Sequence, residues 1–350
     1  MEKQRNLYID LVKGILIILV VLGHAIQFGN GKSYFDGGYY FDNPLFKIIY
    51  SFHMPLFMLI SGYLFYFSMA RKTSPQIFKG KLISLFIPII TYALIIKIYD
   101  YLIGVCDGHE FFYDFFRFTF FDYHLWFLWS VLLNTIIVTI ISKINDSYIT
   151  YIFIGLLLLL IPEHRLHAVY TFVYPFFIIG YWANKFQITK RYGNNHKLLF
   201  AICISFFALL AFYNKESYVY TSGQCINRPN GIHFFVLDFF RFVTGITGCV
   251  LILVVIKWYF NRCYLRLQHK SNDIIIWFTV LGRYSMGIYC FQDLLFNTFI
   301  RSQMPSISSS NGINILTTTI TFLTVLLLST ALTHILRKNK YTNIFLLGGR

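Results

Sequence analysis

Three ionisable side chains lie inside the first long apolar segment of the chain. Residues 7–27 read LYIDLVKGILIILVVLGHAIQ and contain Asp10, Lys13 and His24. At about 100° per residue, Lys13 and His24 fall on one helix face, and Asp10 lies within about 60° of both. A helix in hydrocarbon tolerates such groups where they face a bundle interior or a water-filled cavity. The pattern predicts a polar pathway, with an ion pair at one end and an imidazole about 16 Å further along the axis.

His24 is the candidate general base of this pathway. An imidazole changes its charge near neutral pH and can accept the proton of a hydroxyl. A lone buried His is more often a packing residue that is hydrogen-bonded to a neighbouring helix. Because His24 shares its face with Asp10 and Lys13, we favour a chemical role, with the two charged residues fixing the local charge and orienting a donor or the helix.

A second apolar segment carries polar groups around a proline. Residues 44–65, PLFKIIYSFHMPLFMLISGYLF, contain His53, Pro55, Ser61 and Gly62. The pattern predicts a helix that is kinked at Pro55 and closely approached by another backbone at Gly62. His53, Ser61 and backbone amides freed at the kink are candidate donors to an oxyanion. The alternative is a kinked packing helix with a satisfied His.

Basic residues cluster after this segment. Residues 69–84, MARKTSPQIFKGKLIS, carry Arg71, Lys72, Lys79 and Lys81 and no acid. An ordinary cytoplasmic loop has this composition too, but four cations beside a polar pathway also suit a polyphosphate ligand. The chain has neither a Walker A nor a GxGxxG motif, so scattered charges would hold any nucleotide.

Three other motifs have less specific interpretations. HLWFLW at 124–129 offers His124 and Trp126 as a carbohydrate-stacking surface, or more simply as part of an interfacial aromatic belt. In LGRYSMGIYCFQ, residues 281–292, Arg283 is expected to snorkel to the inner interface. EHRLH at 163–167 lacks a third ligand at helical spacing, so we expect no metal site.

Composition places the chain in the membrane. It has 350 residues, 57% of them hydrophobic and only 13% charged, and these apolar segments exceed what one soluble core buries. We predict an all-α bundle of about ten spans in one domain, residues 1–350, without a separate soluble domain. If the short fifth and sixth spans form a re-entrant pair, eight or nine remain. The spans cover residues 11–30, 46–67, 83–103, 125–142, 148–162, 169–184, 198–213, 234–256, 273–297 and 313–335.

The distribution of basic residues orients the bundle. With a cytoplasmic N-terminus, twenty of the thirty Lys and Arg lie on inner segments and eight on outer segments. This is the positive-inside pattern, so both termini are expected in the cytoplasm and the net charge of +15 needs no nucleic acid. The first span is expected to be retained rather than cleaved. Cys106 and Cys225 fall on the outer side, where a disulfide could form, although the count of cysteines does not fix the pairing.

Five of these motifs together resemble a known family. RNLYIDLVKGILIILVVLGH, SFHMPLFMLISGYLF, FKGKLISLFIPII, HLWFLWSVL and LGRYSMGIYCFQ resemble, in order and spacing, the acyltransferase family 3 membrane proteins, and YIDLVKG is most similar to their fucose 4-O-acetyltransferase-like branch. The resemblance implies about ten spans and transfer of acetyl groups from cytoplasmic acetyl-CoA to glycan hydroxyls. It maps a basic residue and a catalytic His eleven positions later onto Lys13 and His24. Many members have Arg in place of Lys13 and His in place of Gln292.

The resulting hypothesis is a multi-pass O-acetyltransferase of a bacterial plasma membrane. Acetyl-CoA would enter from inside, with its phosphates on the basic loop, and a surface polysaccharide or lipid-linked sugar would approach from outside. Neither a metal nor nucleic acid is expected, and the residues identify neither the acceptor nor an oligomeric state. The alternative is a secondary transporter that uses the same polar pathway, against which stands the absence of an internal sequence repeat. A structural scaffold would leave Asp10, Lys13 and His24 without a role.

Overall fold

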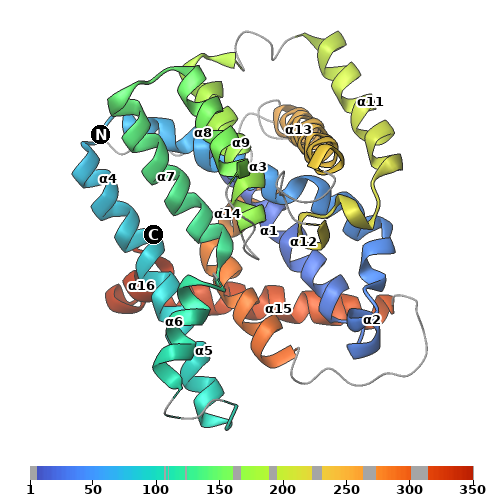
Figure 1. Cartoon of the computed structure of the whole chain (residues 1–350). Helices are drawn as coiled ribbons and strands as arrows, with labels where there is room; N and C mark the ends of the chain where they lie inside the picture. The colour runs from blue at the N-terminus through green and yellow to red at the C-terminus, as the bar shows by residue number, and fades with distance from the viewer. Residues whose placement is uncertain are drawn as a thin grey trace. The chain divides into compact units, whose positions relative to one another are not determined.

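The computed structural model describes residues 6–105, 108, 110–122, 124–160, 167–188, 195–222, 231–262, 273–300 and 314–349, and every regular element in these ranges is helical (Figure 1). The elements are α1 (Leu7–Phe28), α2 (Lys32–Asp36), η1 (Tyr39–Asp42), α3 (Pro44–Met69), α4 (Ser74–Lys81), η2 (Leu82–Phe86), α5 (Ile87–Leu102), α6 (Phe111–Phe120), α7 (Trp126–Ile144), α8 (Tyr148–Leu160), α9 (His167–Lys185), α11 (His196–Phe212), η3 (Lys215–Ser217), α12 (Val219–Ser222), α13 (Gly231–Phe260), α14 (Asp273–Leu294), η5 (Leu295–Ile300), α15 (Ile315–Leu336) and α16 (Lys340–Leu347).

Each of the ten predicted spans coincides with a helix. Within the described residues, seven helical stretches are long and apolar enough to cross a membrane, and they are α1, α3, α4 to α5, α7, α13, α14 with η5, and α15. The helices α8 and α11 are apolar but shorter, and α9 has 19 residues. The all-α polytopic fold is therefore confirmed, while the count of ten and the cytoplasmic termini stay predictions.

The chain divides into two compact units. The first consists of Met1–Phe57, Gly193–Lys215 and Val243–His334, and the second of Met58–Tyr192, Glu216–Phe242 and Ile335–Arg350.

In the first unit, α1 and α14 lie backbone to backbone. A Cβ atom on Gly14 would overlap the carbonyl oxygen of Phe278, and one on Gly282 would overlap that of Asp10. Because only glycine lets two helices approach so closely, this pair of positions sets the distance between them. Ten residues further along each helix, His24 contacts Gln292. The two helices therefore run in the same direction, side by side, for about 15 Å.

Hydrogen bonds fix both ends of α1. At its start, the Asn6 side chain accepts from the backbone N–H of Ile9, which caps the helix. Just beyond its end, the buried Asn30 amide donates to Thr318 Oγ1 at 2.9 Å, and Asn30 Oδ1 accepts from the backbone N–H of Asn314 at 2.7 Å. The helix that carries Asp10, Lys13 and His24 is thus held against the start of α15.

In the second unit, the C-terminal part of α3 approaches α9 closely. A Cβ atom on Gly62 would overlap the carbonyl oxygen of Phe177, which confirms the close backbone approach predicted at Gly62. The Asn184 side chain of α9 also donates to the carbonyl oxygen of Tyr63, at 3.3 Å. Small and polar residues thus join two helices, as is usual in membrane bundles.

The basic segment at 69–84 is largely helical, whereas a loop was expected. Helix α4 begins after Thr73, which forms a reciprocal capping box with Gln76, and Pro75 occupies the first turn, where it needs no backbone donor. It continues without a break through η2 into α5. At the other end of the chain, α16 packs against η2 and α5.

Candidate functional site

His24 and Gln292 form the central polar contact of the first unit. His24 Nδ1 lies 2.6 Å from Gln292 Oε1, and Gln292 Nε2 donates to the carbonyl oxygen of Tyr289 at 3.2 Å. Because the amide nitrogen faces a carbonyl, the amide oxygen must face the imidazole, and His24 Nδ1 therefore carries the proton. Its Nε2 is left as the nitrogen with the lone pair, which is the tautomer that a general base requires.

Two rings and a carboxylate surround this imidazole. The rings of Phe28 and Phe296 meet it edge to face, with centroids 6.0 and 5.8 Å away. Asp293 is close enough for its charge to act on His24, and its Oδ1 accepts from the Asn297 side chain at 2.8 Å. An imidazolium formed at His24 would thus have an acceptor at Nδ1 and a negative charge nearby.

His53 is buried on α3 and is electrostatically coupled to His24. The Tyr50 ring, which packs on Gly23 next to His24, lies 4.7 Å from the His53 ring. His53 Nδ1 donates to the carbonyl oxygen of Ile49 at 2.7 Å, so Nε2 of the neutral ring is an acceptor. The predicted role as an oxyanion donor therefore requires protonated His53.

The predicted backbone amide donors near His53 depend on what Pro55 does to helix α3. Helix α3 runs continuously from Pro44 to Met69 through Pro55. Proline has no N–H, so the group that loses its helical partner is the carbonyl of Ser51. A carbonyl is an acceptor and cannot stabilise an oxyanion. The prediction that Pro55 frees backbone amide donors therefore gains no support from this carbonyl and stays a prediction.

Three charged residues lie close together near Gly14 and Gly282, at the end of the α1–α14 contact that is opposite to His24 and Gln292. Lys13 Nζ lies 3.1 Å from Asp10 Oδ1, which confirms the predicted ion pair. Arg283 Nε lies 3.9 Å from the other oxygen of the same carboxylate. The sequence did not predict this contact, because its pattern indicated that Arg283 extends toward the membrane interface. The Asp10 side chain is only 4% exposed, whereas Lys13 and Arg283 are 20% and 39% exposed. Lys13 and Arg283 are thus two partly accessible cations beside one buried anion, and such cations suit an anionic ligand.

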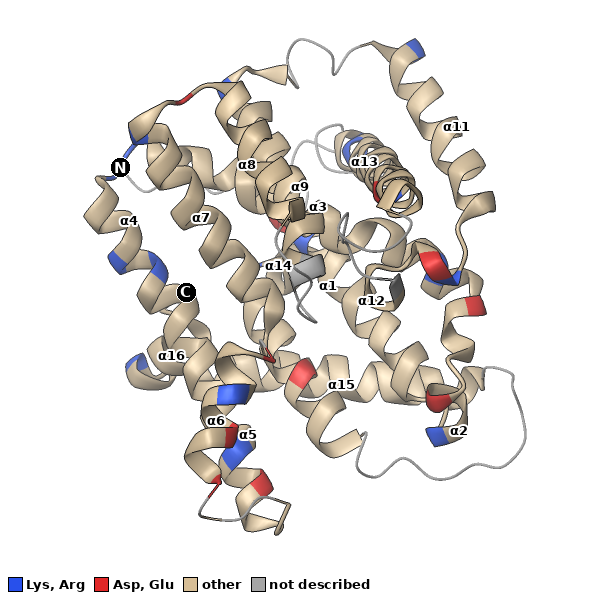
Figure 2. Cartoon of the chain, in the orientation of Figure 1, with Lys and Arg blue, Asp and Glu red and all other residues tan. Residues whose placement is uncertain are grey.

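The predicted basic residues belong to the second unit. Arg71, Lys72 and Lys79 are exposed, and Lys81 is partly buried; Figure 2 shows the blue segments along α4. Arg71 lies over the Phe67 ring and Lys81 over the Phe65 ring, at 5.7 and 5.5 Å from the ring centroids. Ser61, also in this unit, is partly buried on α3.

His124 and Trp126 flank a left-handed residue at the start of α7. Leu125 has a φ of 56°, unusual for a bulky side chain. His124 is buried and stacks on Phe118 at 4.7 Å, and Trp126 packs against Val219. These contacts favour a packing role over an open carbohydrate-stacking surface.

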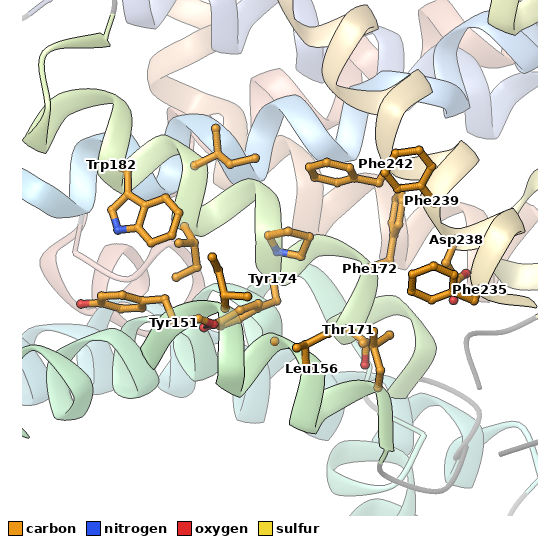
Figure 3. A pocket seen from close by; sticks show the side chains of 16 residues that line it. Tyr151, Leu156, Thr171, Phe172, Tyr174, Trp182, Phe235, Asp238, Phe239 and Phe242 are labelled. Carbon is orange, nitrogen blue, oxygen red and sulfur yellow. Dashed lines mark hydrogen bonds between the residues drawn. The ribbon is translucent and has the colours of Figure 1, made fainter. Parts of the chain in front are cut away.

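The second unit also contains an apolar cavity of about 340 Å³ between α8, α9 and the first turns of α13 (Figure 3). Seven of its sixteen lining residues are aromatic and most of the others are aliphatic, with Thr171 and Asp238 as polar exceptions. Such a lining suits hydrocarbon rather than the phosphates of a nucleotide.

Some predictions fall outside the described residues. These include residues 163–166 of the EHRLH motif, and both Cys106 and Cys225. Within the described residues, no group of three or more His, Cys, Asp or Glu side chains is placed to hold a metal ion. The three described cysteines are free thiols, Cys203, Cys249 and Cys290.

Comparison with known proteins gives the class of this molecule. Residues 6–334 match the family of acyltransferase domains known as acyltransferase family 3. The chain belongs to this family, as the resemblance implied. It is therefore a membrane acyltransferase, with an acyl donor as its co-substrate.

Two named relatives extend this comparison. The chain is 31% identical over 234 residues to nodulation protein NolL of Sinorhizobium fredii, a match that covers 62% of this chain and 60% of the relative. It is 26% identical over 351 residues to nodulation protein NolL of Mesorhizobium japonicum, covering 92% and 83% of the two chains. No solved structure matches the chain.

Proposed function

We propose that this acyltransferase transfers an acetyl group from cytoplasmic acetyl-CoA to a hydroxyl of a sugar, in a surface polysaccharide or on a lipid carrier, at the opposite face of a bacterial plasma membrane. The observation that carries the proposal is the hydrogen bond from His24 Nδ1 to Gln292, which leaves His24 Nε2 as a proton acceptor within the membrane-spanning bundle.

In the proposed reaction, His24 Nε2 accepts the proton of the acceptor hydroxyl while the hydroxyl oxygen attacks the thioester carbonyl carbon. The tetrahedral intermediate collapses with cleavage of the C–S bond, and the leaving thiolate takes the proton back from the imidazolium. Gln292 and the charge of Asp293 stabilise the imidazolium between these steps. An ester and free CoA result, and no acyl-enzyme is needed.

The donor route is proposed on the side of Lys13 and Arg283. These residues add positive charge about 16 Å along α1 from His24, a separation that an extended pantetheine arm can bridge. The four cations of the basic segment, Arg71, Lys72, Lys79 and Lys81, are proposed to bind the CoA phosphates, and Ser61 and His53 are the candidate oxyanion donors. Residues 1–350 would act as one acyltransferase domain with both termini in the cytoplasm.

The proposed sugar acceptor is supported by the resemblance to the fucose 4-O-acetyltransferase-like branch. The competing hypothesis, a transporter that uses the same pathway, lacks any bond chemistry. Membership of an acyltransferase family counts against it.

Purified protein tests the proposal directly. Wild type, supplied with labelled acetyl-CoA and a crude pool of surface glycan or lipid-linked sugar, should form a base-labile ester. In cells, proton NMR of the surface glycans should show O-acetyl groups that disappear when the gene is deleted. No ester from wild type with any donor or acceptor would favour the transporter.

A further inference from the structure

A continuous series of aromatic rings joins the two imidazoles through the segment between α1 and α3. All of these residues belong to the first unit. Neighbouring ring centroids lie 3.8 to 6.0 Å apart along the series His24, Phe28, Phe35, Tyr40, Phe46, Tyr50 and His53. We call the five rings between the two histidines the ring cluster.

The ring cluster has a buried base and a half-buried rim. Phe28 and Phe46 are buried, so they bind the segment to α1 and α3. Phe35 and Tyr40 are only partly buried, as is the neighbouring Phe41, whose ring lies 4.3 Å from that of Tyr40. A series that served only as core would bury all of its faces. Here the partly exposed rings belong to the loop, beyond the end of α1 that carries His24.

Hydrogen-bonding groups lie beside these accessible rings. The Tyr40 hydroxyl lies within the electrostatic reach of the Gln27 side chain, which is one turn beyond His24 on α1. Burial raises the pKa of Tyr40, so its hydroxyl is neutral at physiological pH and can donate as well as accept. The Asn43 side chain similarly lies within the electrostatic reach of the Tyr34 hydroxyl.

Four exposed charges on and beside the segment balance one another. Asp36 and Asp42 are exposed, and so are Lys32 and Lys215. The Lys215 ammonium lies over the Phe41 ring, 5.6 Å from its centroid. Balanced charge disfavours a strongly anionic ligand. Partly exposed aromatic rings beside hydroxyl and amide groups instead suit a neutral sugar, whose C–H groups pack on aromatic rings while its hydroxyls form hydrogen bonds.

We infer that the ring cluster, with Phe41, is the acceptor subsite, and that it seats a neutral sugar ring so that one hydroxyl reaches His24 Nε2. The inference rests on the proposed function. It places acceptor recognition between α1 and α3 and not at His124 and Trp126, which are packed against other side chains.

Two substitutions test the subsite without touching the proposed base. Tyr40→Phe keeps the ring and removes the hydroxyl, and Phe35→Leu replaces a partly exposed aromatic ring with an aliphatic side chain. Each should raise the KM for the glycan acceptor by about tenfold, the effect of losing one stacking or hydrogen-bonding contact. The KM for acetyl-CoA should stay at the wild-type value. Phe207→Leu, at an exposed ring of α11 in the same unit, is the matched control and should change neither constant.

The outcomes separate this inference from the proposed function. If wild type forms ester and both variants keep the wild-type acceptor KM, the subsite is wrong while the acetyltransferase stands. A parallel rise in donor KM would assign the rings to general packing and would also overturn the inference. If Phe35→Leu does not fold, Tyr40→Phe decides alone, because it retains every ring. Ester formation as efficient on an acidic sugar as on a neutral one would contradict the proposed ligand class.

Discussion

His24 and Gln292 each lie ten residues beyond the glycine at which their two helices touch. Because α1 and α14 are in backbone contact at Gly14 and Gly282, the spacing between the helices is already set when they reach His24 and Gln292. A 2.6 Å hydrogen bond then follows from geometry and does not depend on a flexible loop. The close backbone contact between α1 and α14 thus positions the proposed base.

Loss of the proposed base should stop the chemistry without unfolding the protein. His24→Ala and His24→Gln are each expected to slow the chemical step by about 10² to 10⁴-fold, the usual contribution of a positioned general base. The Gln variant keeps a donor and an acceptor but cannot titrate. Single-turnover ester formation is the measurement, with size-exclusion profiles as the folding control. Full activity of His24→Gln would remove His24 from the mechanism.

Gln292 should act through the orientation of His24. Gln292→Leu removes the acceptor at Nδ1 and is expected to lower kcat by about 10 to 100-fold, the worth of a hydrogen bond to a charged group. The KM for acetyl-CoA should hardly change.

Gln292→His is the informative companion of this variant, because many family members have His there. A neutral imidazole can accept from His24 Nδ1, so activity should recover well above that of Gln292→Leu. Equal activity of wild type and Gln292→Leu would show that the contact has no catalytic role.

The glycine contact gives a stability prediction. Gly14→Ala places a Cβ atom into the backbone of α14, so the helices must separate, at an expected cost of about 1 to 3 kcal/mol. Thermal unfolding in detergent should show a lower midpoint. Gly80→Ala is the control, because nothing lies within 4 Å of its Cβ position. Equal midpoints for the two variants would contradict the tight seam.

The basic segment should affect the donor more than the acceptor. Lys79→Ala combined with Lys81→Ala is expected to raise the KM for acetyl-CoA, by about 1 to 3 kcal/mol in binding free energy if both contact phosphate. Lys257→Ala, which removes an exposed cation of the first unit, serves as the control. An unchanged KM for acetyl-CoA would mean that the basic segment only orients the chain in the membrane and does not bind the donor.

The orientation can be tested by cysteine labelling. In a cysteine-free background, Asp114→Cys should react with an impermeant maleimide on intact cells, and Thr73→Cys only after permeabilisation. This follows from the excess of basic residues on the predicted inner segments. The reverse labelling pattern would place the basic segment outside the cell, where it could not bind cytoplasmic acetyl-CoA.

Sequence predicted the long helices and the local ion pair but not the contacts between helices. Apolar length predicts a span, and spacing places Asp10 beside Lys13, because both are properties of one segment. The contact between His24 and Gln292 joins residues 268 positions apart, and no periodicity indicates which helix faces which. The short helices α2, α6 and α16 were missed for a related reason, since tertiary packing rather than length stabilises them.

The parallel direction of α1 and α14 limits how many times the chain crosses the membrane. Two helices that cross in the same sense are separated by an odd number of crossings. Four of the seven candidate spans lie between them, namely α3, α4 to α5, α7 and α13. With those seven crossing, either one or all three of α8, α9 and α11 must cross as well. The total is then eight or ten, an even number that brings both chain ends to one face of the membrane.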